Sequence, residues 1–250
     1  MRRVSLSNPF DNAPVYFLEE TDSTMDDAEE LIRRGCPSGT VVRAAYQRQG
    51  RGRIPERRWI SEPGANLLFT LILKLSELPL GLTALPLRCG LGLAYCLEEA
   101  FQLQVAIKWP NDCLIEGRKL AGILCRGGGG YGLIGMGINL FSPGAQDLRR
   151  PAAGIAEFAD LPVKPGPLLE LLLPRLKRAL ESPHWREEVE SRLYARGRTV
   201  RVFPGGAVAL HGEESYLGRI AGLDTEGGVV IVAESGRRHR LVSGELEILD

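Results

Sequence analysis

The chain has 250 residues, 44% hydrophobic and 25% charged, and its 31 basic and 31 acidic side chains give a formal net charge of +0. These values are typical of a globular protein with a sizeable core, and they exclude a global positive field that would draw the chain onto nucleic acid or an anionic membrane. The five cysteines form no C-x-x-C pair, which argues against a disulfide framework and a zinc site. No signal peptide is apparent and the apolar runs are too short to span a bilayer, so we expect a cytoplasmic protein.

The first half of the chain predicts strands and two helices. Strands are predicted at residues 15–21, 40–46 and 66–73, and helices at residues 23–35 and 82–103. Ser23 is the candidate N-cap of the first helix and Gly35 its stop. The second helix pattern is interrupted early by Pro86. The strand at 66–73 is almost entirely apolar, so we expect it to be covered on both faces.

The second half of the chain predicts adjacent antiparallel strands, then helices, then a series of short strands. Strands are predicted at residues 105–109, in a hairpin over 112–126 and at 131–140, and helices at 165–181 and 184–196. Pro174 is expected to interrupt the first of these helices. From Gly197 onward, short β-patterned runs joined by glycine turns predict a small β-barrel-like module. The architecture is therefore α+β, with a main domain at 1–196 and a C-terminal module at 197–250.

One basic segment stands out in this neutral chain. Residues 46–59 read Y-Q-R-Q-G-R-G-R-I-P-E-R-R-W, too rich in Gly and Pro for a regular helix or strand. The glycines let a backbone approach a ligand, the arginine forks fit phosphate oxygens, and Trp59 offers a face for a purine. By itself the segment is equally compatible with a mobile surface loop. A nucleic-acid patch is less favoured, because only one aromatic residue is interleaved.

Three further blocks carry candidate ligand groups. K-W-P-N-D places Asn111 and Asp112 at the start of a strand, where they either hold a ligand or cap the turn. K-L-A-G-I-L places Lys119 at a strand start, where a lysine is commonly a solvated edge charge. Only five of the 31 basic residues are lysines, which weakly favours a specific need for this one. G-M-G-I-N has two glycines inside an apolar strand, which indicates either close approach by a ligand or another chain, or a β-bulge, and Asn139 ends that strand.

In this order, the blocks resemble those of the biotin protein ligases (biotin–acetyl-CoA-carboxylase ligases). The shared features are Ser-Thr at a helix start, G-R-G-R…W, K-W-P-N-D, K-L-A-G-I-L, G-x-G-I-N and the small β module, from about residue 15 to the C-terminus. The resemblance implies a mixed β-sheet catalytic domain flanked by helices, as in class II aminoacyl-tRNA synthetases and biotin ligases, followed by an SH3-like β-barrel. Family members that double as repressors carry an N-terminal helix-turn-helix domain, and we expect the form without it.

The resemblance also implies an activity. Biotin would be activated by ATP to biotinyl-5′-AMP and then passed to a lysine of a biotin carboxyl carrier protein domain of a biotin-dependent carboxylase. Mg²⁺ would enter with ATP, and no residue is assigned to a metal. The oligomeric state is left open, with a homodimer as one possibility, because some family members dimerise and others are monomeric. No nucleic acid or membrane partner is expected. A lipoate or octanoate ligase of the same fold, and a non-catalytic biotin-binding protein, remain alternatives.

Matching the motifs assigns roles to individual residues. The implied catalytic residues are Lys119, Arg53, Arg51 and Asp112. The implied biotin site comprises Ser23, Thr24, Met25, Gln47, Arg51, Gly52, Arg53 and Lys119. The implied ATP site comprises Trp59, Asn111, Gly135 and Asn139. Lys119 would bridge the biotin carboxylate and the α-phosphate, while Asp112 would orient Lys119 or an arginine, or approach magnesium.

The sequence departs from the family pattern in two places. The I-P-E segment makes the arginine loop one residue longer, and Pro55 stiffens its tip, so that either Arg57 or Arg58 takes the place of the family's later arginine. Met25 stands where Asn is common, and we expect its thioether to pack on the apolar part of biotin. The loop is expected to become ordered over bound ligand and to shield the mixed anhydride from water.

Overall fold

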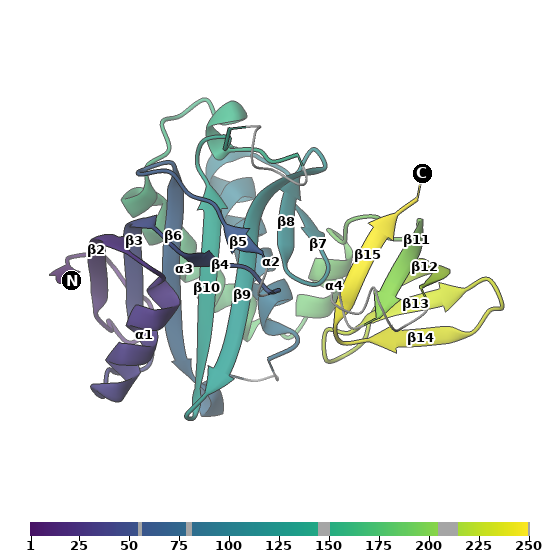
Figure 1. Cartoon of the computed structure of the whole chain (residues 1–250), viewed down its shortest axis with the longest axis horizontal. Helices are drawn as coiled ribbons and strands as arrows, with labels where there is room; N and C mark the ends of the chain where they lie inside the picture. Colours follow the sequence, from purple (N-terminus) through teal and green to yellow (C-terminus); the bar gives the residue numbers. More distant parts are fainter. Residues whose placement is uncertain (55–56, 79–81, 145–150, 205–214, 250) are drawn as a thin grey trace.

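The computed structural model describes residues 1–54, 57–78, 82–144, 151–204 and 215–249. It contains an eight-stranded sheet with helices on both faces and, beside it, a five-stranded C-terminal sheet (Figure 1). The order of the large sheet is β1-β2-β3-β6-β10-β9-β8-β7. Only β2 and β3 pair in parallel, and every other pair in this sheet is antiparallel. The α+β class predicted from the sequence is confirmed.

The strands of the large sheet follow the predicted segments closely. They are β1 (Arg2–Val4), β2 (Val15–Thr21), β3 (Val41–Gln47), β6 (Asn66–Lys74), β7 (Ala106–Lys108), β8 (Asp112–Ile115), β9 (Arg118–Gly128) and β10 (Tyr131–Asn139). The run from β7 to β10 is an antiparallel meander, as predicted. The short edge strand β1 was not predicted, because its sequence has no apolar alternation.

Four α-helices accompany the sheets within the described residues, namely α1 (Thr24–Arg33), α2 (Leu85–Phe101), α3 (Pro165–Glu181) and α4 (Trp185–Glu190). The two expectations about prolines are wrong. Pro86 lies in the first turn of α2, where a missing N–H leaves no hydrogen bond unmade, and Pro174 lies inside α3 without ending it. In the described part of the chain, no helix is both long and apolar enough to cross a bilayer.

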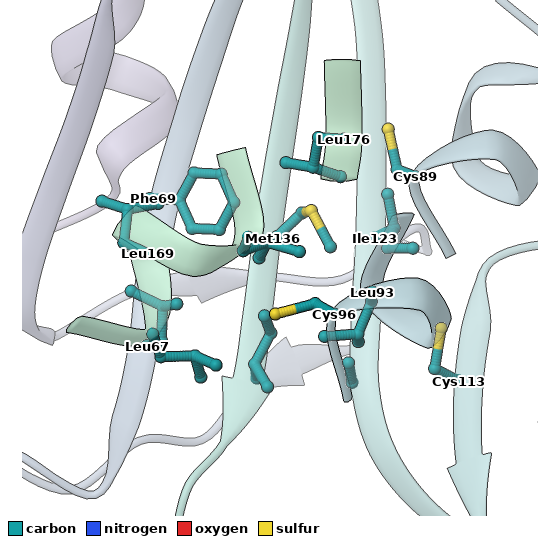
Figure 2. Packing of buried hydrophobic residues seen from close by; sticks show 14 of the residues in the cluster. Leu67, Phe69, Cys89, Leu93, Cys96, Cys113, Ile123, Met136, Leu169 and Leu176 are labelled. Carbon is teal, nitrogen blue, oxygen red and sulfur yellow. The ribbon is translucent and has the colours of Figure 1, made fainter. Parts of the chain in front are cut away.

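The two faces of β6 are both covered, as its apolar sequence predicts. Leu67 and Phe69 point toward α2 and α3, where they pack with Leu93, Met136 and Leu169 in the main core (Figure 2). The residues of β6 that alternate with them, such as Ile72, face the other side, where α1 packs on β3, β6 and part of β10. The rest of that face, over β9 and β10, is therefore left available for a site.

The C-terminal sheet is antiparallel, with the order β14-β13-β12-β11-β15. Its strands are β11 (Thr199–Pro204), β12 (Tyr216–Leu223), β13 (Val229–Ala233), β14 (Arg238–Leu241) and β15 (Gly244–Ile248). This sheet agrees with the predicted SH3-like β module, although within the described residues it is not closed, since β14 and β15 are opposite edges that do not pair with each other. Trp109 fastens this sheet to the large one by donating its indole N–H to the carbonyl of Gly227 at 3.1 Å.

Candidate active site

A cavity of about 610 Å³ opens on the α1 side of the large sheet. Its walls come from the start of α1, the arginine-rich segment, the β7–β8 turn, β9, β10 and the start of β15. All of the residues that the sequence assigned to biotin, ATP or catalysis line it: Ser23, Thr24, Met25, Gln47, Arg51, Gly52, Arg53, Trp59, Asn111, Asp112, Lys119, Gly135 and Asn139. Segments as far apart in the chain as the start of α1 and the start of β15 are thus brought to one place.

At one end of the cavity, the cap of α1 meets the end of β3. The Ser23 hydroxyl accepts a hydrogen bond from the Met25 backbone N–H at 3.4 Å, as the N-cap prediction expected. The side-chain oxygen of Gln47 accepts from the backbone N–H of Thr24 at 2.8 Å and from the Thr24 hydroxyl at 3.0 Å. A backbone N–H can only donate, so the amide oxygen of Gln47 faces Thr24 and its NH₂ group is left for other partners. This end is a polar pocket with fixed donors and acceptors.

At this end of the cavity, the Met25 side chain packs against Gly135 of β10. This side chain is buried, and a Cβ added at Gly135 would lie 3.2 Å from the Met25 sulfur. Gly135 therefore makes room for Met25, on the side of the residues assigned to biotin rather than beside Trp59. The sequence had placed Gly135 with the nucleotide, and the geometry favours the opposite end of the cavity.

Lys119 and Asp112 form the charged centre of the cavity. The Lys119 ammonium lies 2.6 Å from an Asp112 carboxylate oxygen and 5.8 Å from the centre of the Trp59 ring. The Lys119 backbone is held by hydrogen bonds to Pro151 and Ala153, both at 2.9 Å. Of the three roles left open for Asp112, the contact with Lys119 is the one present here.

The position of the Trp59 indole explains why residues 122 and 137 are glycines. A Cβ at Gly137 would lie 2.6 Å from Trp59 Cε2, and a Cβ at Gly122 would lie 3.1 Å from Trp59 Cζ3. The β9–β10 register runs through both glycines without a shift, so no bulge accounts for them. The group that lies close to these two glycines is therefore the Trp59 side chain, rather than a ligand or another chain. The Trp59 indole N–H is buried and has no hydrogen-bond partner within the described residues.

The arginine-rich segment is more regular than its composition suggested. Strands β4 (Gly50–Arg51) and β5 (Arg58–Trp59) pair with each other, and Gly52 N–H donates to the Arg57 carbonyl at 2.8 Å. The glycines are required because a Cβ at Gly52 would lie 2.7 Å from that carbonyl oxygen. Pro55 and Glu56, where the sequence departs from the family pattern, lie outside the described residues.

This segment rests on the C-terminal sheet. Arg53 donates to the carbonyl of Gly244 at 2.9 Å, and Arg57 pairs with the carboxylate of Glu245. Burial lowers the pKa of Arg53, and the Glu245 carboxylate opposes that effect. The sequence reading missed Glu245, because no local pattern links residues so far apart in the chain.

The two asparagines hold the strands around the cavity together. Asn111 donates to the Ile123 carbonyl at 2.9 Å. Asn139 donates to the Lys119 carbonyl at 3.3 Å and accepts from Asn66 at 2.9 Å. The Asn111 amide thus fixes the backbone at Ile123, the Asn139 amide fixes that at Lys119, and both side chains line the cavity.

No group of three or more His, Cys, Asp or Glu side chains that could hold a metal ion occurs among the described residues. Asp112 and Glu245 are the carboxylates that line the cavity, and both are paired with cations. A divalent cation that arrives with ATP would take ligands from the phosphate oxygens and from water, as Mg²⁺ usually does.

Comparisons with known proteins agree with this geometry. Residues 17–139 match the model of the biotin/lipoate A/B protein ligase family. The biotin–[acetyl-CoA-carboxylase] ligase of Paracoccus denitrificans is 31% identical over 245 residues, covering 88% of this chain and 95% of that protein. The bifunctional ligase/repressor BirA of Bacillus subtilis is 43% identical over 103 residues, but this match spans 41% of this chain and only 31% of that protein.

A solved structure has the same fold over nearly its whole length. The biotin protein ligase from Aquifex aeolicus, in complex with biotin and ATP, superposes with a TM-score of 0.79 at 28% identity, covering 94% of this chain and 98% of that one. Fold and cavity together define an adenylate-type acyl ligase site. The chain belongs to the biotin/lipoate A/B protein ligase family and, within it, groups with the biotin protein ligases. The resemblance seen in the sequence is confirmed.

Proposed function

We propose that this chain is an ATP-dependent biotin protein ligase, which forms biotinyl-5′-AMP and transfers the biotinyl group to a lysine of a carrier domain. The observation that carries this proposal is the single cavity in which Lys119, Arg51 and Arg53 adjoin the polar pocket at Ser23 and Gln47. The named biotin ligases among its relatives support the same activity.

The first step joins two anions, and the cavity supplies fixed positive charge for it. An oxygen of the biotin carboxylate attacks the α-phosphorus of ATP, the bond from that phosphorus to the bridging oxygen breaks, and pyrophosphate leaves. The Lys119 ammonium neutralises both reacting groups while Asp112 keeps it in place. Charge that is positioned before the reaction needs no reorganisation during it, which is the main source of rate enhancement in such sites. Mg²⁺ arriving with ATP would lower the charge of the phosphate chain.

The second step consumes the mixed anhydride. The uncharged amine of the carrier lysine attacks the biotinyl carbonyl carbon, AMP leaves with the bonding electron pair, and the amine proton passes to solvent. The β4–β5 pair lies in front of β9 and β10 (Figure 1), and its residues Arg51, Arg58 and Trp59 line the cavity, so it limits access of water to the anhydride.

The polar pocket favours biotin over lipoate. The ureido ring of biotin carries both donors and an acceptor, which can satisfy Ser23, Gln47 and neighbouring backbone groups. The dithiolane of lipoate offers neither, and a ligand that leaves buried polar groups unpaired is strongly disfavoured. The biotin ligases among the relatives point the same way.

The acceptor is a biotin carboxyl carrier protein domain of a carboxylase, and the reaction runs in the cytoplasm, where ATP is available. Residues 1–196 form the catalytic unit and 197–250 a module that holds the arginine-rich segment. The contacts of Arg53 and Arg57 with β15 support this division of labour.

One assay tests the central proposal. The protein is incubated with biotin, ATP labelled in the β- and γ-phosphates and an isolated carrier domain, and released pyrophosphate and biotinylated carrier are measured. We expect both products with biotin and neither with lipoate or octanoate. Pyrophosphate release with lipoate but not with biotin would reassign the substrate, and binding of biotin without any release would make the chain a non-catalytic binding protein.

A further inference from the structure

One polar side chain lies in the buried middle of β6. Thr70 interrupts the apolar run N-L-L-F-T-L-I-L, and it is 0% exposed. It pairs with Gly135 of β10 on one side and with Val42 of β3 on the other. Thr70 does not line the cavity, so it touches no ligand there.

Thr70 is connected to the polar pocket through one hydroxyl. The Thr70 and Thr24 hydroxyl oxygens lie 2.9 Å apart, and the distance alone does not say which one donates. The Thr24 hydroxyl also lies 3.0 Å from the side-chain oxygen of Gln47. That atom is an oxygen rather than a nitrogen, because it accepts from the Thr24 backbone N–H. An amide oxygen has no proton to give, so the Thr24 hydroxyl must donate to it.

The direction of the whole chain of hydrogen bonds follows. A hydroxyl has a single proton, and that of Thr24 is committed to Gln47. In the contact with Thr70, therefore, Thr24 accepts and Thr70 donates. The order is Thr70 to Thr24 to the oxygen of Gln47, which leaves the Gln47 NH₂ group as a donor. The alternative order would set the Thr24 and Gln47 oxygens against each other without a proton between them, inside a buried site where that is costly.

We propose that Thr70 is a positioning residue for head-group recognition. By donating to Thr24, it directs the Thr24 proton to Gln47 and so fixes the Gln47 amide with its N–H groups available to a ligand acceptor such as a cyclic urea oxygen. This inference rests on the proposed biotin substrate and adds a residue that acts on specificity without touching the ligand.

The test compares substitutions that keep or remove the Thr70 hydroxyl. Thr70→Val has nearly the same shape without the hydroxyl, and Thr70→Ser keeps the hydroxyl. Thr40→Val is the matched control, because Thr40 is also 0% exposed and its hydroxyl donates to the Pro37 carbonyl at 2.7 Å, away from the cavity. For each variant, biotin affinity is measured by calorimetry, KM for biotin and for ATP and kcat by pyrophosphate release, and Tm by thermal unfolding.

We expect Thr70→Val to raise the Kd and KM for biotin by about five- to twentyfold, the effect of one lost hydrogen bond in a buried network. KM for ATP and kcat should stay within about twofold, because the phosphate end of the cavity is untouched. Thr70→Ser should restore most of the biotin affinity, and Thr40→Val should leave it unchanged while lowering Tm comparably. In a Thr24→Val background, Thr70→Val should have little further effect on biotin affinity, because the two hydroxyls act as one chain.

Other results overturn the inference. Unchanged biotin affinity in Thr70→Val, a loss equal to that of Thr40→Val, or parallel losses for biotin and ATP would reduce Thr70 to a structural residue. Additive effects of Thr24→Val and Thr70→Val would do the same. If Thr70→Val does not fold, the smaller Thr70→Ala is measured by the same criteria. A wild-type protein that binds no biotin would instead refute the proposed substrate.

Discussion

The ammonium of Lys119 lies 2.6 Å from the carboxylate of Asp112, across the β8–β9 hairpin. The register of this hairpin shifts between Cys113 and Leu114, so Asp112 pairs with Gly122 while Leu114 pairs with Lys119. The carboxylate and the ammonium thereby meet inside the cavity, where both are partly exposed. Lys119 thus has an anionic partner before any substrate carboxylate or phosphate is present.

This pair gives the first prediction. Lys119→Ala should lower the single-turnover rate of biotinyl-AMP formation by about 10²–10³, the usual effect of removing one positioned charge from a transition state. Lys119→Arg should not restore it, because a planar guanidinium does not replace a compact ammonium beside Trp59. Asp112→Asn should cost about tenfold through loss of a charged hydrogen bond. The control is Lys74→Ala, at the exposed end of β6, and an equal loss there would contradict the assignment.

A second prediction concerns the contact between the arginine-rich segment and the C-terminal sheet. Glu245→Gln removes the charge that pairs with Arg57, so we expect KM to rise about fivefold for ATP and for biotin, because Trp59 and Arg53 of the same segment line the cavity. Glu247→Gln on the same strand is the matched control, because Glu247 is an exposed residue paired with Arg201 at 3.5 Å. Steady-state kinetics with each substrate varied in turn measure the two KM values. A similar rise in both variants would show that general loss of negative charge is responsible.

Substitutions at two glycines of β10, Gly135 and Gly137, should raise KM for different substrates. Gly137→Ala forces the Trp59 indole off the sheet, so we expect KM for ATP to rise about tenfold, the range of a lost base-stacking contact. Gly135→Ala crowds the flexible Met25 side chain instead and should raise KM for biotin. Gly128→Ala in β9 has nothing within 4 Å of the added Cβ and should change neither value. If Gly135→Ala affected ATP rather than biotin, the original assignment of Gly135 to the nucleotide would stand.

The buried cysteines predict a pH dependence. Burial raises the pKa of Cys89 to about 12 and that of Cys96 to about 12. Both therefore remain protonated at pH 8 and should resist alkylation by iodoacetamide until the protein is unfolded with guanidinium. Because an unfolded thiol ionises near pH 8.5, these groups contribute stability below that pH and lose it progressively as the pH rises toward 12. The free energy of unfolding should fall over that interval, and Cys89→Ala with Cys96→Ala should lessen the fall.

The helices and strands were largely predictable because each depends on a local period. The apolar run at 66–73, the cap at Ser23 and the hairpin after Asp112 are readable from neighbouring residues alone. The prolines were misread for the same reason. Whether Pro86 or Pro174 interrupts a helix depends on where the helix begins and on packing that the local pattern does not contain.

The sequence by itself pointed to many of the residues that line the cavity, although not to Glu245, because the family's motifs can be matched to it position by position. Only the tertiary structure decided how these groups face one another. The order β6-β10-β9 lays Trp59 on Gly137, and the packing of the C-terminal sheet brings Gly244 to Arg53, 191 positions away. Thr70 is the clearest case, because a buried threonine becomes informative only when the proton of a neighbouring hydroxyl has been traced. Periodicity records which face a side chain occupies, whereas its partner across the sheet is set by register and strand order.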